Sequence, residues 1–242
     1  MSDQALVPNA GDVGQQLALP NLAGAEFATP QHFDEMVRAS FMPRVSLMAG
    51  TSGMVMEGKM SVGKFCFLRT GDDYVDLGDS FNFIPISYRF AAMRFAGADS
   101  KMEIYYNPQS PEFLQIKEES EGPDSGCNYG PQFLIWVPTV KDFATYHFGS
   151  KSARPIARDA GRLLNQNATM KAKLVQGKQT PPKKWHVPQI FPCSMQLELP
   201  DIATATAVAE KFNKPGEKEV SQKEATEPGQ TPATPSGEER PR

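Results

Sequence analysis

Short runs of alternating apolar and polar residues dominate residues 43–138 and predict β-strands. Clusters of Gly, Asp, Asn and Pro separate these runs, as is typical of turns. The predicted strands cover residues 45–48, 54–56, 64–68, 81–87, 102–106, 113–116 and 133–137. Residues 88–95 fit either a strand or a helix, and their aromatic residues favour a strand. Because no helices separate the strands, the pattern predicts a mainly β (α+β) protein with an antiparallel barrel or sandwich.

Three peripheral helices are predicted around this region. The first begins at the N-cap Thr29, the second near Ser152 with Pro155 in its first turn, and the third at the N-cap Asp201. Each has apolar residues at helical spacing on one side. A closing strand is predicted over residues 194–199, and an exposed loop over residues 118–130.

The composition indicates one globular domain with unstructured ends. Residues 1–28 form a predicted flexible acidic arm, residues 29–212 a single β-rich domain, and residues 213–242 a disordered tail. No run of 18 apolar residues and no secretory signal is found, so no membrane partner is expected. The three widely spaced cysteines favour reduced thiols and a cytoplasmic location.

Charge is distributed unevenly along the chain. The whole chain carries a net charge of −3, whereas residues 151–184 hold nine Lys and Arg against the single acid Asp159, a local charge of +8. We call residues 150–188, which include this run, the basic segment. Its charge predicts a surface that binds a polyanion. The alternative interpretation is a solvated helix face followed by a basic loop.

Arginine and aromatic side chains alternate in and around the basic segment. Arg154, Arg158 and Arg162 fall on one helix face at i, i+4 and i+8, and a guanidinium suits phosphate oxygens. Tyr146 and Trp185 flank charged or Pro-rich positions, so they are expected to be partly exposed, as is His147. Aromatic rings beside cations are what single-stranded nucleic acid requires, although most Phe and Trp residues of a β-rich domain pack in its core.

Four short motifs occur in a characteristic order: MPRVSL at residues 42–47, GKF at 63–65, FLIWVP at 133–138 and FGSKSAR at 148–154. In this order the chain resembles phage-encoded single-stranded DNA-binding proteins with an OB-type barrel, over residues 40–200. The resemblance implies an OB-like fold and a role in phage DNA replication or recombination. It implies that Tyr146, Lys151, Arg154, Arg158 and Trp185 hold the DNA. Many such proteins end in an acidic tail with an apolar tip, whereas this chain ends Arg-Pro-Arg, which puts tail-mediated recruitment in doubt.

The sequence therefore predicts a non-enzymatic, sequence-tolerant protein that binds single-stranded DNA, and it leaves homo-oligomer formation open. The predicted nucleic-acid-binding residues are Tyr146, Lys151, Arg154, Arg158, Arg162, Lys171, Lys173, Lys183, Lys184 and Trp185. A viral structural or assembly protein with homo-oligomeric contacts is the main alternative. An enzyme would need an acid–base pair that the sequence does not reveal. No cofactor and no metal are expected, because the three histidines lie far from one another and from the cysteines.

Overall fold

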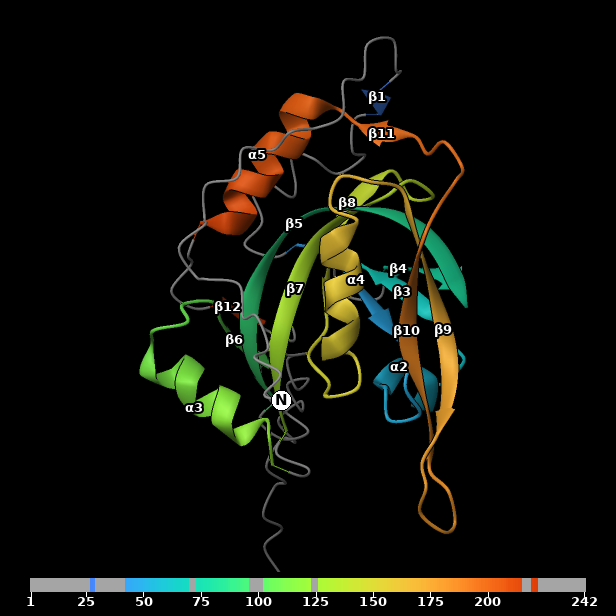
Figure 1. Ribbon diagram of the computed structural model, residues 1–242, viewed down its shortest axis with the longest axis vertical. Coiled ribbons are helices and arrows are strands. Elements are labelled where there is room, and N and C mark those ends of the chain that lie inside the picture. The colour runs from blue at the N-terminus through green and yellow to red at the C-terminus, as the bar shows by residue number, and fades with distance from the viewer. Residues whose placement is uncertain are drawn as a thin grey trace, which may run out of the picture.

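The structure is a computed structural model that describes residues 27–28, 42–69, 73–95, 102–122, 126–214 and 219–221. The predicted acidic arm and the helix predicted from Thr29 lie outside the described residues, apart from residues 27–28, and so does most of the predicted tail. In the part of the chain that is described, strands predominate and helices are peripheral (Figure 1). The predicted α+β class, mainly β, is confirmed.

The elements follow one another in a simple order along the chain. The strands are β1 (Phe27–Ala28), β2 (Arg44–Leu47), β3 (Phe65–Leu68), β4 (Tyr74–Gly78), β5 (Ser80–Phe95), β6 (Met102–Tyr105), β7 (Cys127–Val137), β8 (Asp142–His147), β9 (Ala168–Gln176), β10 (Lys184–Pro192), β11 (Leu199–Pro200) and β12 (Glu219–Ser221). The helices are α2 (Gly53–Met56), α3 (Pro111–Glu119), α4 (Ala157–Arg162) and α5 (Ile202–Asn213), with the 3-10 turn η1 (Arg154–Ile156) before α4.

Ten strands form one mixed sheet in the order β10-β9-β5-β7-β8-β2-β3-β4, with β6 paired to β5 and β12 paired to β6. The ladder between β2 and β8 is parallel, and the others in this sheet are antiparallel. The sheet curls until β10 contacts β2, yet no ladder joins these two strands among the described residues. The strand order ends at β10 and β4, and no ladder closes it among the described residues. The sheet is therefore mixed and open, and the predicted antiparallel barrel is not confirmed.

The long strand β5 makes this curl possible. Its 16 residues pair with β9 at one end, with β7 through most of its length and with β6 at the other end. The register with β7 shifts between Pro85 and Ser87. A proline lacks the N–H that a central strand needs, so it is tolerated at such a bulge, where the strand bends.

The two faces of the sheet bury different clusters. Inside the curl, Phe65, Phe67 and Phe133 belong to a core that also contains the small residues of α4. On the outer face, Leu134 and Trp136 pack with the buried side of α5. Strand alternation explains this division, because Phe133 and Leu134 are neighbours on β7 and point to opposite faces.

Several predicted elements are confirmed. Strands appear at residues 45–48, 64–68, 81–87, 102–106 and 133–137 with shifted ends, and the ambiguous residues 88–95 belong to β5. Asp201 caps α5 as expected, because its carboxylate accepts a hydrogen bond from the Thr204 N–H at 2.8 Å. The second predicted helix is present as η1 and α4, but its first turn uses Ser150 rather than Ser152: the Ser150 hydroxyl accepts from the Ala153 N–H at 3.2 Å.

Four local predictions were wrong. Residues 54–56 and 113–116 are helical, in α2 and α3, instead of extended. Ser110 caps α3 by accepting from the Phe113 N–H at 3.2 Å, and Pro111 occupies the first turn, so Phe113 and Ile116 are buried at helical rather than strand spacing. The predicted closing strand over 194–199 is reduced to β11, and the predicted loop over 118–130 already contains the start of β7. No helix in the described residues is long and apolar enough to cross a membrane.

Candidate nucleic-acid interface

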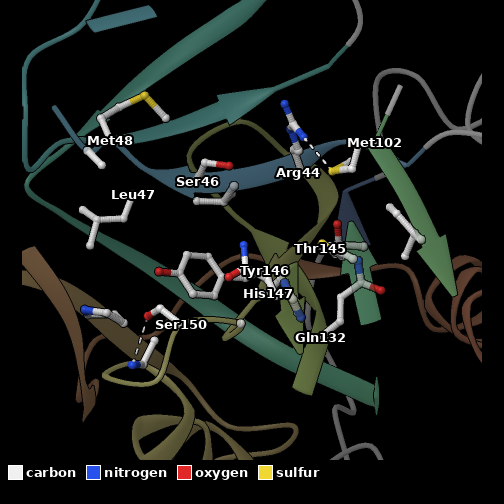
Figure 2. A pocket seen from close by; sticks show the side chains of 18 of the residues that line it. Arg44, Ser46, Leu47, Met48, Met102, Gln132, Thr145, Tyr146, His147 and Ser150 are labelled. Atoms are coloured by element: carbon white, nitrogen blue, oxygen red, sulfur yellow. Dashed lines mark hydrogen bonds between the residues drawn. The ribbon is translucent and has the colours of Figure 1, made fainter. Parts of the chain in front are cut away.

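A pocket of about 730 Å³ lies between the curled sheet, the edge strand β10 and the C-terminal end of α5; we call it the groove (Figure 2). Five cationic side chains line it: Arg44, Arg89, Lys184, Lys211 and Lys214. Within the described ranges, the lining contains no Asp and no Glu. Cations gathered in a concave surface without acids focus a positive potential that attracts anions.

The floor of the groove continues the sheet face that α5 covers. Leu134 and Trp136 lie under α5, and Gln132 follows on the same face of β7, beyond the end of the helix. His147 of β8 and Arg89 of β5 are the register partners of Gln132 on either side. The face therefore changes from apolar to polar where α5 ends, which leaves polar side chains open to a ligand.

Three of the five cations have no ion pair among the described residues. Arg44 is exposed, and its guanidinium donates a hydrogen bond to the Met102 sulfur, at 4.0 Å. Lys184 starts β10, and Lys214 follows the last turn of α5; both are exposed. Cations that are not neutralised by nearby carboxylates retain their full attraction for phosphate groups.

Arg89 lines the groove and also holds neighbouring parts of the fold together. Its Nε donates to Gln132 Oε1 at 3.0 Å and its Nη1 donates to the Phe212 carbonyl oxygen at 2.5 Å. The guanidinium carbon lies 3.3 Å from the centroid of the Tyr106 ring and 4.3 Å from that of Phe212. Arg89 thus connects β5, β7 and Tyr106, the residue that follows β6, to the end of α5, which carries Lys211.

Aromatic side chains line the groove at two depths. Trp185, on the edge strand β10, is 40% exposed and presents its indole to solvent. Tyr146 is only 5% exposed, and burial raises the pKa of its hydroxyl, which therefore stays protonated. An exposed indole beside cations is suited to stack on a base, whereas Tyr146 is reached only from inside the groove.

The imidazole of His147 lines the groove in a neutral form. Burial lowers its pKa to about 4, because the charged form loses its hydration there; nearby backbone carbonyls oppose this effect in part. The ring packs so closely on Gly149 that a Cβ at that glycine would lie 2.5 Å from it. His147 therefore adds no positive charge to the groove at neutral pH.

The groove contains three of the ten predicted site residues: Tyr146, Lys184 and Trp185. The expected exposure of Trp185 is confirmed, and His147 is of intermediate burial. The expected partial exposure of Tyr146 was wrong, because its ring faces the core side of β8 and contacts Phe65 and Phe148.

None of the three arginines of the arginine-rich helix lines the groove, although Ser150, Ser152 and Ala153 just before it do, and Arg154 is held by contacts within the fold. Arg154 forms an ion pair with Glu121 and donates to the Ser120 hydroxyl at 2.9 Å and to the Gly149 carbonyl at 3.2 Å. Lys151 also contacts Glu121. The other two predicted residues of the helix, Arg158 and Arg162, are exposed on α4, and Arg162 lies 3.6 Å from Asp159.

The remaining predicted lysines belong to the β9–β10 hairpin. Lys171 and Lys173 on β9 are exposed, as is Lys183 just before β10, and none of the three lines the groove. In Figure 1 this hairpin extends along one side of the sheet and ends beyond it. Apart from Lys184, the basic side chains of this hairpin lie outside the lining of the groove.

Sequence reasoning missed Arg44, Arg89, Lys211 and Lys214. They belong to elements that are far apart in sequence, and none is part of a cationic run. The available signal was a single cation inside an apolar strand, as at Arg44 beside Val45 and at Arg89 between Tyr88 and Phe90. Such a cation disturbs the apolar pattern and often indicates a functional position.

The described residues contain no group of three or more His, Cys, Asp or Glu side chains that could hold a metal ion. Comparison with protein-family models, curated proteins and solved structures finds no match to this chain. The geometry of the groove is therefore the basis for assigning a function.

Proposed function

We propose that the protein binds single-stranded nucleic acid, and specifically DNA, in the groove, without strong preference for sequence. The observation that carries this proposal is the combination of five cationic side chains and the exposed Trp185 in one pocket whose described lining has no acid. Lys and Arg would replace counterions along the phosphates, while the indole stacks on a base.

The open, curled sheet supports an OB-like interpretation of the fold. OB-type proteins bind strands across the face of a small, partly open barrel. Here the groove is lined by residues of β2, β8 and β7 and is flanked by β10 and the end of α5. A role in phage DNA replication or recombination rests on the resemblance of the sequence motifs and completes the proposal.

A titration with single-stranded oligothymidine of about 30 nucleotides, longer than the site of one OB fold, tests the proposal. Binding is followed by tryptophan fluorescence at several salt concentrations, with duplex DNA of equal length as a control. We expect affinity to fall steeply with salt and the single strand to bind much more tightly than the duplex. The absence of binding at low salt would contradict the proposal.

Single variants localise the binding. Arg44→Ala and Lys184→Ala each remove one unpaired groove cation, so each should reduce the slope of log K against log salt by about 0.7. Lys117→Ala removes an exposed cation of α3 that lies outside the groove, and it should leave the slope unchanged. An equal reduction of the salt slope in all three variants would show that the protein attracts the strand over its whole surface rather than in the groove. The double variant Arg158→Ala/Arg162→Ala measures any contribution of the basic helix.

A role in assembly is the second candidate, and one observation favours it. Tyr88 is 43% and Phe90 38% exposed on β5, on the side of the strand opposite Arg89. Their rings stack on Phe133 and Tyr129 and form an apolar surface that a second copy could cover. Light scattering of the wild type and of the double variant Tyr88→Ser/Phe90→Ser tests this role. An assembly role predicts an oligomer for the wild type and a monomer for the variant.

A further inference from the structure

The groove is lined by polar side-chain groups that have no hydrogen-bond partner among the described residues. Tyr146 is 5% exposed, yet its hydroxyl makes no hydrogen bond within the described residues. Nδ1 of His186, on β10, is buried and also lacks a partner. Both side chains line the groove. Nε2 of His147, which also lines the groove, is likewise buried without a partner among the described residues. Buried polar atoms are almost always hydrogen-bonded, so these unpartnered groups in one pocket indicate a ligand that provides the missing bonds.

The walls around Tyr146 and His186 are apolar. The seam is the part of the groove lined by Leu47, Met48, Tyr146, Trp185 and His186, where β2 and β10 contact each other without pairing. Figure 2 shows the Tyr146 hydroxyl directed toward the space between Leu47 and Ser150. A small number of convergent polar groups between apolar walls is the usual composition of a site for a planar organic ligand.

A cation lies beside the seam. Lys184 directly precedes Trp185 on the same edge strand, is exposed and has no ion pair among the described residues. A ligand with a planar, hydrogen-bonding ring and an attached phosphate therefore matches the seam and its edge. A nucleotide has this chemistry, whether it belongs to a strand or is free in solution.

We infer that the seam binds one nucleobase, whose edge hydrogen-bonds to the Tyr146 hydroxyl and to His186 while its phosphate lies near Lys184. This inference rests on the proposed function, because it assigns part of the groove to one base of the bound strand, which is no longer stacked on its neighbours in that strand. Binding along the rest of the groove depends on phosphates and on stacking, whereas the seam recognises the base itself.

The test compares wild type with Tyr146→Phe, which removes the hydroxyl and leaves the ring in place. Tyr88→Phe is the matched control, because it deletes the same group from an exposed tyrosine outside the groove. Each protein is titrated with a short single strand of mixed sequence and with an abasic strand of equal length. Tyr146→Phe should lower affinity for the base-bearing strand about three- to tenfold, the value of one hydrogen bond, and leave abasic binding unchanged.

Thermal unfolding tests whether Tyr146→Phe lowers affinity merely by destabilising the fold. The Tyr146 hydroxyl makes no hydrogen bond to any residue that the structure describes, so the Phe variant should unfold at the wild-type temperature or above it. Unchanged affinity of Tyr146→Phe for the base-bearing strand, or an equal loss on both strands, would overturn the inference while leaving the proposed function intact.

Failure of wild type to bind either strand would instead refute the proposed function. In that case the four deoxynucleoside monophosphates, each titrated by NMR, decide the remaining question. A monophosphate bound by wild type and by Tyr88→Phe, but more weakly by Tyr146→Phe, would retain the seam as a site for a free nucleotide. Binding of none of the four would overturn the inference as well.

Discussion

The guanidinium of Arg89 holds the last turn of α5 through both the backbone and the side chain of Phe212. It donates to the Phe212 carbonyl at 2.5 Å and lies 4.3 Å from the centroid of the Phe212 ring. A helix C-terminus carries a partial negative charge that would repel phosphates. Arg89 offsets this charge and keeps α5, which carries Lys211 and is followed by Lys214, beside the groove.

The Arg89→Lys variant should therefore destabilise the fold even though the positive charge is kept. Lysine cannot reproduce the planar stacking between Tyr106 and Phe212 or both hydrogen bonds, so we expect a loss of about 2 kcal/mol in the free energy of unfolding. Urea denaturation measures it. The control is Arg158→Lys, an exposed arginine without an ion pair among the described residues, which should change stability little. Equal stability of the two variants would contradict the structural role of Arg89.

Trp185 should report the bound strand, because it is 40% exposed whereas Trp136 is fully buried. In Trp185→Phe the fluorescence change on DNA binding should disappear, while a ring that can stack remains. In Trp185→Ala the binding free energy should weaken by about 1–3 kcal/mol, the usual contribution of one stacked base. Anisotropy of a labelled strand measures both variants independently of tryptophan. A fluorescence change that persists in Trp185→Phe would place the strand elsewhere.

Acidification should destabilise the protein through His147. The folded pKa of about 4 lies below the usual value near 6.5, so between these values the unfolded state binds a proton that the folded state does not. Stability therefore falls as the pH drops through this window, by about 3 kcal/mol once it is complete. Urea midpoints for wild type and His147→Gln, measured between neutral pH and about pH 4, test this prediction. An identical pH dependence of the two proteins would contradict it.

Gly63→Ala should disturb both the fold and the seam. Gly63 has a φ of +80°, and an added Cβ would lie 2.6 Å from Nε2 of His186. Left-handed strain and the displaced imidazole together should cost about 1–3 kcal/mol of stability. Gly53→Ala is the matched control, since a Cβ there meets nothing within 4 Å, and it should be neutral. Thermal denaturation distinguishes the two variants, and a fully stable Gly63→Ala protein would contradict the close contact with His186.

Local patterns were sufficient for much of the secondary structure. The alternation in residues 133–137 predicted a strand, and the cap at Asp201 predicted the start of α5, because both depend on neighbouring residues only. The same reasoning failed at residues 113–116, where a four-residue apolar pattern is compatible with either element. There the cap at Ser110 was the deciding local feature.

The sequence by itself determined that strands predominate, that the peripheral helices α4 and α5 have one apolar side, and that residues 151–184 are strongly basic. Only the tertiary structure decided which cations lie together. Arg44, Arg89 and Lys214 come from distant parts of the chain and line one groove because β5, β7, β8 and β2 are neighbours in the sheet and α5 packs against it. The physical reason is that register and curvature depend on long-range packing, whereas charge and periodicity are local properties of the chain.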